Sequence, residues 1–279
     1  MKFFALIFLV CLAIGADARK KKKLFRRILN KLSHLEDLIK KKQACYPPKP
    51  TPASSCKEIY EKDSASPNKA YNLKLGNKYL SVYCSMDGEL GDCGCGGWTL
   101  VMKIDGAKHN FNYDSKAWCS RSSISPENGE TGLDHLETLL PTYWSTSFTK
   151  ICLGMKVDGV TRFLRVDRAA ASLYTLIADG QYRATSLGRD AWKKLIGPKA
   201  SLQRNCNQEG FSSRVSSSVH SRVRIGIISN QEGNCHSPDS FIGFGGGGSG
   251  FNNACGNGAS WGPDNGNKNI KAFGYIFVQ

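Results

Sequence analysis

The cysteines constrain the fold of this chain more than any other feature of its sequence. Eleven are spread over 279 residues. Cys11 lies in an apolar amino-terminal stretch, and the even, dispersed set that remains indicates a framework of up to five disulfides in an exported chain. A zinc site is disfavoured, because Cys93-Gly94-Cys95 is a C-x-C motif without a second pair at zinc-ribbon spacing. The remaining set comprises Cys45, Cys56, Cys84, Cys93, Cys95, Cys119, Cys152, Cys206, Cys235 and Cys255.

The amino terminus predicts export. Met1-Lys2 is followed by an apolar run from Phe3 to Ile14 and then by Gly15-Ala16-Asp17-Ala18, which is the pattern of a secretory signal peptide. A membrane-spanning helix needs about 20 apolar residues, and this run is shorter. We therefore expect residues 1–18 to be removed, with cleavage after Ala18 or Ala16. The mature protein is expected to be secreted and extracellular, without a transmembrane segment.

The basic charge of the chain is concentrated in one segment. Residues 19–42 carry 11 Lys and Arg against Glu36 and Asp37, a net charge of +9, whereas the whole chain carries +15. Residues 43–279 hold 26 basic and 20 acidic residues, a net charge of +6. A nucleic-acid-binding domain would need a basic stripe of its own, so we expect no nucleic-acid partner for the body of the protein.

The basic arm is patterned as a helix. Phe25, Ile28, Leu32, Leu35 and Ile39 are spaced 3, 4, 3 and 4 apart, which places them on one helical face. Three interpretations stay open: a short oligomerising coiled coil over 24–40, a cationic amphipathic helix on anionic surfaces, or a spacer or propeptide. Two heptads are fewer than a confident coiled-coil prediction needs.

Two further segments follow the arm. Residues 43–55 are rich in proline, which cannot continue a helix, and we expect an extended linker. Cys45 lies at its start and is predicted either to pair inward or to cross-link two chains. Residues 56–279 are long enough for one substantial domain or two tightly joined lobes.

The secondary structure of residues 56–279 is predicted to be α+β with an antiparallel sheet. Glycine and asparagine dominate the C-terminal quarter, where we expect loops held by disulfides. Strands are expected over 97–104, 150–157, 222–228 and 272–278, where β-branched and aromatic residues gather, and short helices over 134–140 and 190–196.

Three motifs in order carry a family resemblance. Ser55-Cys56-Lys57-Glu58-Ile59, Val82-Tyr83-Cys84-Ser85-Met86 and Gly96-Gly97-Trp98-Thr99-Leu100-Val101 together resemble the opening of fibrinogen C-terminal-like domains. The resemblance implies that domain's twisted antiparallel sheet with short helices, and a Cys56–Cys84 disulfide at the domain entry. With Leu140 to Trp144 and Ala178 to Arg183, the chain also resembles divergent secreted fibrinogen-related proteins of cnidarians, some of which occur in coral skeletal organic matrix.

The C-terminal region is similar to the family in outline. Glu232-Gly233-Asn234-Cys235, with Cys255 after it, is similar to a late disulfide loop of the family that lies next to its calcium and ligand sites. This likeness implies a Cys235–Cys255 disulfide. The run from Ile242 to Gly248 looks like the glycine-rich stretch of intelectins, which are calcium-dependent lectins. The Asp-x-Asp calcium pair of fibrinogen-type domains is replaced here by Ser229-Asn230-Gln231-Glu232.

Catalytic motifs were sought and none indicates an enzyme or an organic cofactor. Gly243-x-Gly245-x-x-Gly248 matches a dinucleotide motif literally, but no helix-forming segment follows it, and we interpret it as a loop. No nucleophile elbow, P-loop or N-glycosylation sequon is present. Disulfide formation is expected to consume the thiols that a cysteine nucleophile would need.

Binding residues are predicted at the Gly/Asn-rich end. Carboxylate and amide oxygens are calcium ligands, so calcium is the expected cofactor. An ion beside an aromatic ring is a common way to hold a sugar diol; the alternative is that these are turn residues. The predicted calcium ligands are Asn230, Glu232, Asp239 and Asp264, and the predicted ligand contacts are Trp261 and Tyr275.

Two functions are therefore predicted for this chain. The first is a secreted fibrinogen-related binding protein with lectin-like recognition of extracellular glycans. The alternative is a structural component of an extracellular or skeletal (biomineral) organic matrix, anchored to polyanionic matrix by its basic arm. In either case, residues 24–40 and Cys45 are the candidate segments through which a homo-oligomer could form, and the oligomeric state stays open.

Overall fold

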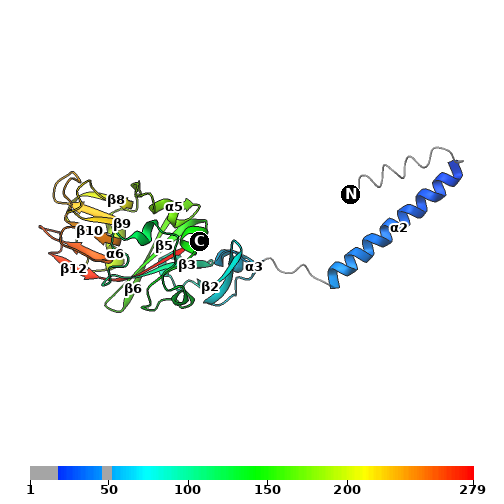
Figure 1. Ribbon diagram of the computed structural model, residues 1–279, viewed down its shortest axis with the longest axis horizontal. Helices are drawn as coiled ribbons and strands as arrows, with labels where there is room; N and C mark the ends of the chain where they lie inside the picture. Colours follow the sequence, from blue (N-terminus) through cyan, green and yellow to red (C-terminus); the bar gives the residue numbers. More distant parts are fainter. Residues whose placement is uncertain (1–17, 46–51) are drawn as a thin grey trace. The chain divides into compact units, whose positions relative to one another are not determined.

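The computed structural model describes residues 18–45 and 52–279, and the chain divides into one unit ending at Thr51 and another running from Pro52 to Gln279 (Figure 1). The predicted signal peptide and most of the predicted linker lie outside the described residues, and so does the side chain of Cys45. Among the residues that are described, no helix has both the length and the apolar content needed to cross a membrane.

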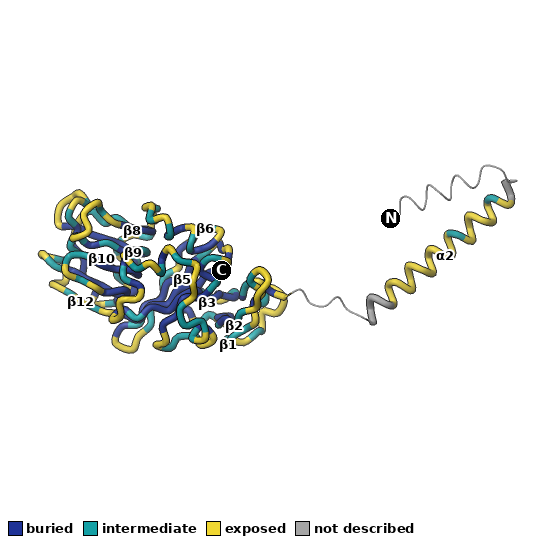
Figure 2. The backbone as a smooth tube through the Cα atoms, viewed as in Figure 1, coloured by how far each residue is buried: buried dark blue, intermediate teal, exposed yellow. Residues whose placement is uncertain are grey.

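The basic arm is a single helix, α2 (Ala18–Cys45). At a rise of about 1.5 Å per residue it spans roughly 40 Å. Most residues of the helix are exposed (Figure 2), including most of its large apolar ones; Phe25 is 62% exposed and Leu35 is 53% exposed. The helix thus presents an uncovered apolar face together with its cations.

The first sheet has seven strands, all antiparallel, in the order β1-β2-β3-β13-β5-β6, with β4 beside β3. The C-terminal strand β13 enters the middle of the sheet, because its buried aromatic and β-branched residues need cover on both faces. The strands are β1 (Lys69–Leu75), β2 (Lys78–Ser85), β3 (Trp98–Asp105), β4 (Thr138–Leu139), β5 (Phe148–Val157), β6 (Val160–Ala170) and β13 (Phe273–Val278).

The second sheet has six antiparallel strands in the order β12-β11-β10-β9-β8-β7. Short helices and 3-10 turns fill the connections of both sheets. The strands are β7 (Arg183–Ala184), β8 (Asn205–Ser213), β9 (Arg222–Asn230), β10 (Ser240–Gly247), β11 (Cys255–Ala259) and β12 (Lys268–Lys271). The helices and turns are α3 (Cys56–Lys62), η1 (Gly91–Cys93), η2 (Lys116–Cys119), η3 (Pro126–Glu130), α4 (Thr142–Ser145), α5 (Leu173–Ile177) and α6 (Arg189–Ile196).

A row of four glycines crosses the second sheet. Gly210 pairs with Gly226, Gly226 with Gly243, and Gly243 with Gly256, on the successive strands β8 to β11. A Cβ atom at any of the four would collide with a carbonyl oxygen of the neighbouring strand. Gly226 has a φ of +155°, which L side chains rarely adopt. The four glycines therefore allow the backbones of neighbouring strands to lie closer together than any side chain at these positions would permit.

The main hydrophobic core lies between the two sheets and includes Ile225 of β9, Ile276 of β13 and Trp192 of α6. A second cluster under the β1–β2 hairpin contains Cys56, Cys84 and Trp98. The fold is thus α+β, with twisted antiparallel sheets, short helices and disulfide bonds, as the sequence predicts.

Most predicted elements occur, and two predictions are wrong. The predicted strands correspond to β3, β5, β9 and β13, and the predicted helix over 190–196 corresponds to α6. Residues 134–140 form no helix, because Thr138 and Leu139 pair with β3 as strand β4. The glycine-rich run from Gly243 is not a loop, since it continues through Gly247 as strand β10, where its glycines pack against β9 and β11.

Candidate ligand-binding cleft

Three disulfides link the described residues of the main unit. Cys56 bonds Cys84, as the family resemblance implies, with their Cα atoms 5.5 Å apart. Cys93 bonds Cys152. In the part of the chain described, Cys95 and Cys119 are exposed and unpaired.

The predicted Cys235–Cys255 disulfide is wrong. Cys235 bonds Cys206 instead, with a Cα–Cα distance of 5.2 Å. The pairing of β8 with β9 places Asn205 opposite Asn230, which brings Cys206 to the loop after β9. Cys255 lies on β11, is fully buried and carries a free thiol, whose pKa is raised by burial.

The four predicted calcium ligands are not assembled into one site. Asn230 uses its amide within its own loop, where its Nδ2 donates to the carbonyl of Asn234 at 2.8 Å. Asp239 accepts a hydrogen bond from the Ser249 hydroxyl at 3.0 Å, and Glu232 is exposed. Within 18–45 and 52–279, no three His, Cys, Asp or Glu side chains lie close enough together to hold a metal ion.

Asp264, the fourth of these residues, is held by two cations. It accepts hydrogen bonds from Arg189 at 2.8 Å and from Lys193 at 2.6 Å. Burial raises the pKa of Asp264, but the hydrogen bonds from Lys193 and Arg189 outweigh it and bring the pKa to about 2. Asp264 therefore positions helix α6 as an ionised carboxylate.

The two predicted aromatic contacts differ in environment. Trp261 is 71% exposed and available to a ligand. Tyr275 is fully buried in β13, and its hydroxyl donates to the carbonyls of Leu133 and Asp134. Burial raises the pKa of Tyr275. The structure therefore assigns Tyr275 to the core, which contradicts its predicted contact with a ligand.

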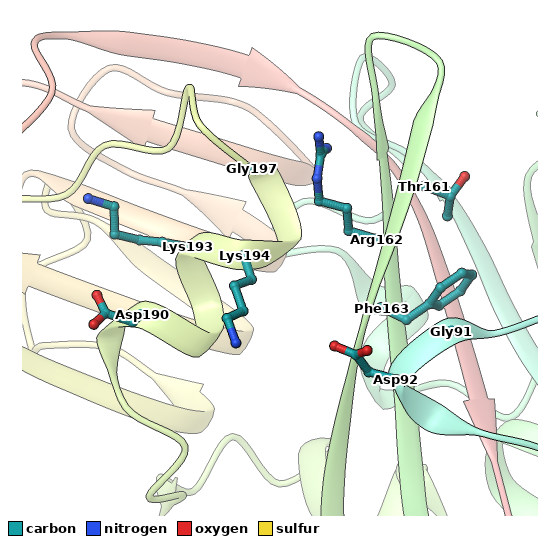
Figure 3. Close-up of a pocket in the computed structure, with 9 residues that line it drawn as sticks. All are labelled: Gly91, Asp92, Thr161, Arg162, Phe163, Asp190, Lys193, Lys194 and Gly197. Carbon is teal, nitrogen blue, oxygen red and sulfur yellow. The ribbon is translucent and has the colours of Figure 1, made fainter.

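A cleft of about 560 Å³ lies between helix α6, strand β6 and turn η1 (Figure 3). Its helix side is formed by Asp190, Lys193, Lys194 and Gly197. Its opposite side consists of Thr161, Arg162 and Phe163 from β6 and Gly91 and Asp92 from η1. Three segments that are distant in sequence therefore meet around one space.

Helix α6 is fixed from beneath by a buried carboxylate. Glu209 of β8 accepts hydrogen bonds from the indole of Trp192 at 2.7 Å and from the Thr185 hydroxyl at 2.7 Å. It also accepts from the backbone N–H groups of Leu187 and Gly188 at the start of the helix. Burial raises the pKa of Glu209, but these donors together keep it below its ordinary value. The helix is thereby oriented with its lysines on the cleft side.

Glycines make room for the two large side chains of the β6 wall. A Cβ at Gly197 would collide with the guanidinium of Arg162, which donates to the carbonyl of Ile196 at the end of α6. The helix C-terminus carries partial negative charge, so it favours this cation. A Cβ at Gly154 would collide with the ring of Phe163. Both side chains are therefore held in place before any ligand binds.

The charged groups of the cleft are only partly neutralised. Lys193 is paired with Asp264, whereas Lys194, Asp92 and Asp190 form no ion pair among the described residues. Figure 3 shows Lys194 extending from the helix toward the side on which the Asp92 carboxylate lies, while the ring of Phe163 points away from the helix. A cation and a carboxylate can bond the hydroxyl or charged groups of a ligand, and an aromatic ring can pack on its apolar face.

Sequence patterns alone did not single out this cleft. Lys193 and Lys194 follow Trp192 in a helix that the sequence predicts, and that doublet was the one available signal. Phe163 and Asp92 lie in segments without a motif: the pairing of β5 with β6 positions Phe163, and the Cys93–Cys152 disulfide holds η1, with Asp92, beside β5.

Solved structures that are similar to this chain include two fibrinogen-like globe domains. No protein-family model and no curated protein matches this chain. The fibrinogen-like globe domain of human ANGPTL6 has 14% identity and a TM-score of 0.36, over 82% of this chain and 96% of that one. The fibrinogen-like globe domain of human ANGPTL2 has 15% identity and a TM-score of 0.32, over 82% and 99%. At identities and TM-scores this low, neither likeness supports a statement about function. The functional proposal therefore rests on the residues of the cleft.

Proposed function

We propose that this chain is a secreted binding protein, not an enzyme, and that it recognises extracellular glycans in a lectin-like manner at the α6–β6 cleft. The observation that carries the proposal is that Phe163, Asp92 and Lys194 all line one open cleft, with Lys194 and Asp92 on opposite sides of it. The C–H face of a sugar ring would pack on the phenyl ring. The carboxylate would accept from sugar hydroxyls, and the ammonium would donate to hydroxyl or acidic groups.

The covalent structure supports an extracellular setting. Three disulfides form in the described part of the domain, and disulfides persist in oxidising compartments. The amino-terminal signal pattern predicts the same location.

The test is a glycan array probed with the full-length secreted protein and its variants, with and without a calcium chelator. Phe163→Ala and Lys194→Ala should each weaken binding by about tenfold, the equivalent of about 1.4 kcal/mol. Lys199→Ala is the matched control, since Lys199 is an exposed lysine near the end of the same helix that pairs with Asp158 outside the cleft.

The outcomes separate the alternatives. Binding that survives chelation and falls in both cleft variants supports direct recognition by these side chains. Binding lost on chelation would assign a role to calcium instead. If the cleft variants bind like Lys199→Ala, the glycan site lies elsewhere on the protein.

A second function is favoured by helix α2. We propose that the arm anchors the protein to polyanionic extracellular or skeletal matrix, because its cations accompany an apolar face that is exposed along the helix. Replacing Lys20, Lys21, Lys22 and Lys23 together by glutamine should lower the salt concentration at which full-length protein elutes from heparin. The same elution salt for variant and wild type would refute the anchor.

A further inference from the structure

A second groove, of about 600 Å³, lies beside the β1–β2 hairpin of the first sheet. It is lined by the start of β2, the loop after η2 and helix α4, and we call it the hairpin groove. Its chemistry is set by Lys78 and Tyr79 of the hairpin, Arg121 and Ser122 of the loop, and Trp144 of α4. None of these residues lines the α6–β6 cleft.

The hairpin groove contains aromatic hydrogen-bond donors without protein partners. Among the described tryptophans, Trp98, Trp118 and Trp192 each donate their indole N–H to a protein oxygen. Trp144 is half-buried and packs on the main core, yet its indole N–H has no acceptor in the described chain. Tyr79 is 59% exposed. Buried and half-buried indoles usually find a partner, so this free donor is available to a ligand.

Two cations flank these rings. The guanidinium of Arg121 lies over the ring of Tyr174, 4.8 Å from its centroid, and that ring packs edge-on against Tyr143. Stacking holds the guanidinium in place while leaving its N–H groups free to donate. Lys78 forms no ion pair within the described residues. No Asp or Glu lines the groove.

We propose that the hairpin groove is a second binding site, for a glycan segment that carries sulfate or carboxylate groups. The aromatic side chains offer faces for sugar rings, the free indole and Ser122 can bond hydroxyls, and the cations bind the anionic substituents. An acidic peptide fits less well, because an extended peptide needs free backbone partners. The backbones of Leu75 and Lys78 at this groove pair with each other across the hairpin.

The experiment uses the full-length protein and a sulfated disaccharide, with its desulfated form as a second probe. Binding is followed by tryptophan fluorescence, with Trp144→Phe to identify the reporting ring. Arg121→Ala and Lys78→Ala should each weaken binding of the sulfated probe by about tenfold, the usual effect of losing a charge-assisted hydrogen bond. The desulfated probe should bind equally weakly to all variants.

Two controls separate this site from its surroundings. Arg204→Ala removes an exposed arginine that lies just before strand β8, outside the groove, and should leave the affinity unchanged. Lys194→Ala alters the α6–β6 cleft and should also leave it unchanged, so failure of the proposed function and failure of this site give different results. The α2 arm is identical in all variants and contributes the same background.

The proposal is overturned if Arg121→Ala and Lys78→Ala bind the sulfated probe like wild type, or if Trp144→Phe gives the same fluorescence change as wild type. It is also overturned if a short acidic peptide displaces the disaccharide at lower concentration than the disaccharide itself, since the natural occupant would then be a peptide. Circular dichroism of each variant establishes that a loss of binding is not a loss of fold.

Discussion

Glu209 is the single side chain whose removal should most affect both the stability of the domain and its cleft. It is a buried carboxylate that accepts four hydrogen bonds, and no cation neutralises it among the described residues. Replacing it in Glu209→Ala leaves all four donors without their acceptor. Because two of them belong to the backbone that starts α6, the lysines of the cleft should lose their fixed orientation at the same time.

The size of the effect follows from the burial of each donor. The Trp192 indole is fully buried, and an unsatisfied buried donor costs about 1–3 kcal/mol. Thr185, Leu187 and Gly188 are half-buried or exposed, so water can replace the carboxylate there at a net loss of about 0.5–1.5 kcal/mol each. The free energy of unfolding should therefore fall by about 2.5–7.5 kcal/mol.

The assay is thermal unfolding followed by near-ultraviolet circular dichroism. For a domain of this size, each 1 kcal/mol shifts Tm by roughly 2–4 °C, so Glu209→Ala should melt roughly 5–30 °C below wild type. Glu209→Gln keeps the shape and one acceptor oxygen and should fall between the two. Glu232→Ala removes an exposed glutamate and is expected to have little effect. A Glu209→Ala protein that melts at the wild-type temperature would refute the assigned role.

Three further changes test other parts of the structure. Asp264 has a pKa of about 2 against an ordinary 3.8, so its contribution to stability is complete above pH 3.8 and is lost as the pH falls toward 2. In acid titrations, the difference in the free energy of unfolding between wild type and Asp264→Asn should shrink over that interval. Lys103 is buried and donates to Asp134 and to Thr131, so Lys103→Met should cost about 2–4 kcal/mol in urea unfolding, and an unchanged midpoint would contradict the pairing. Gly226→Ala should cost about 2–4 kcal/mol through collision and backbone strain, whereas Gly233→Ala, in open space, should cost little in the same assay.

Local patterns predicted local structure well. Strand β3 and helix α6 carry their own signals, an aliphatic run in one case and buried residues on one face in the other. The Cys56–Cys84 pair followed from the family motifs. Residues 134–140 have a helical composition, yet pairing of Thr138 and Leu139 with β3 overrides it.

Long-range pairing accounts for what the sequence did not reveal. The partner of Cys235 depends on β8 lying beside β9, and the spacing of the cysteines in the sequence does not predict that strand order. The cleft depends in the same way on β6 folding back along β5 to face α6. Composition suggested Asp264 as a calcium ligand but could not show that two cations already bind it. Those cations, Arg189 and Lys193, come from a helix some seventy residues earlier in the chain.

The glycine row across β8 to β11 has a consequence for inheritance. Any codon change that replaces a glycine by another amino acid adds at least a Cβ atom, and at Gly210, Gly226, Gly243 and Gly256 that atom has no room. Selection should therefore remove nearly every missense variant at these four positions, while the exposed loops between them drift freely. Distant relatives of this chain should be recognisable by four aligned glycines on consecutive strands, even where the rest of the sequence has diverged beyond detection.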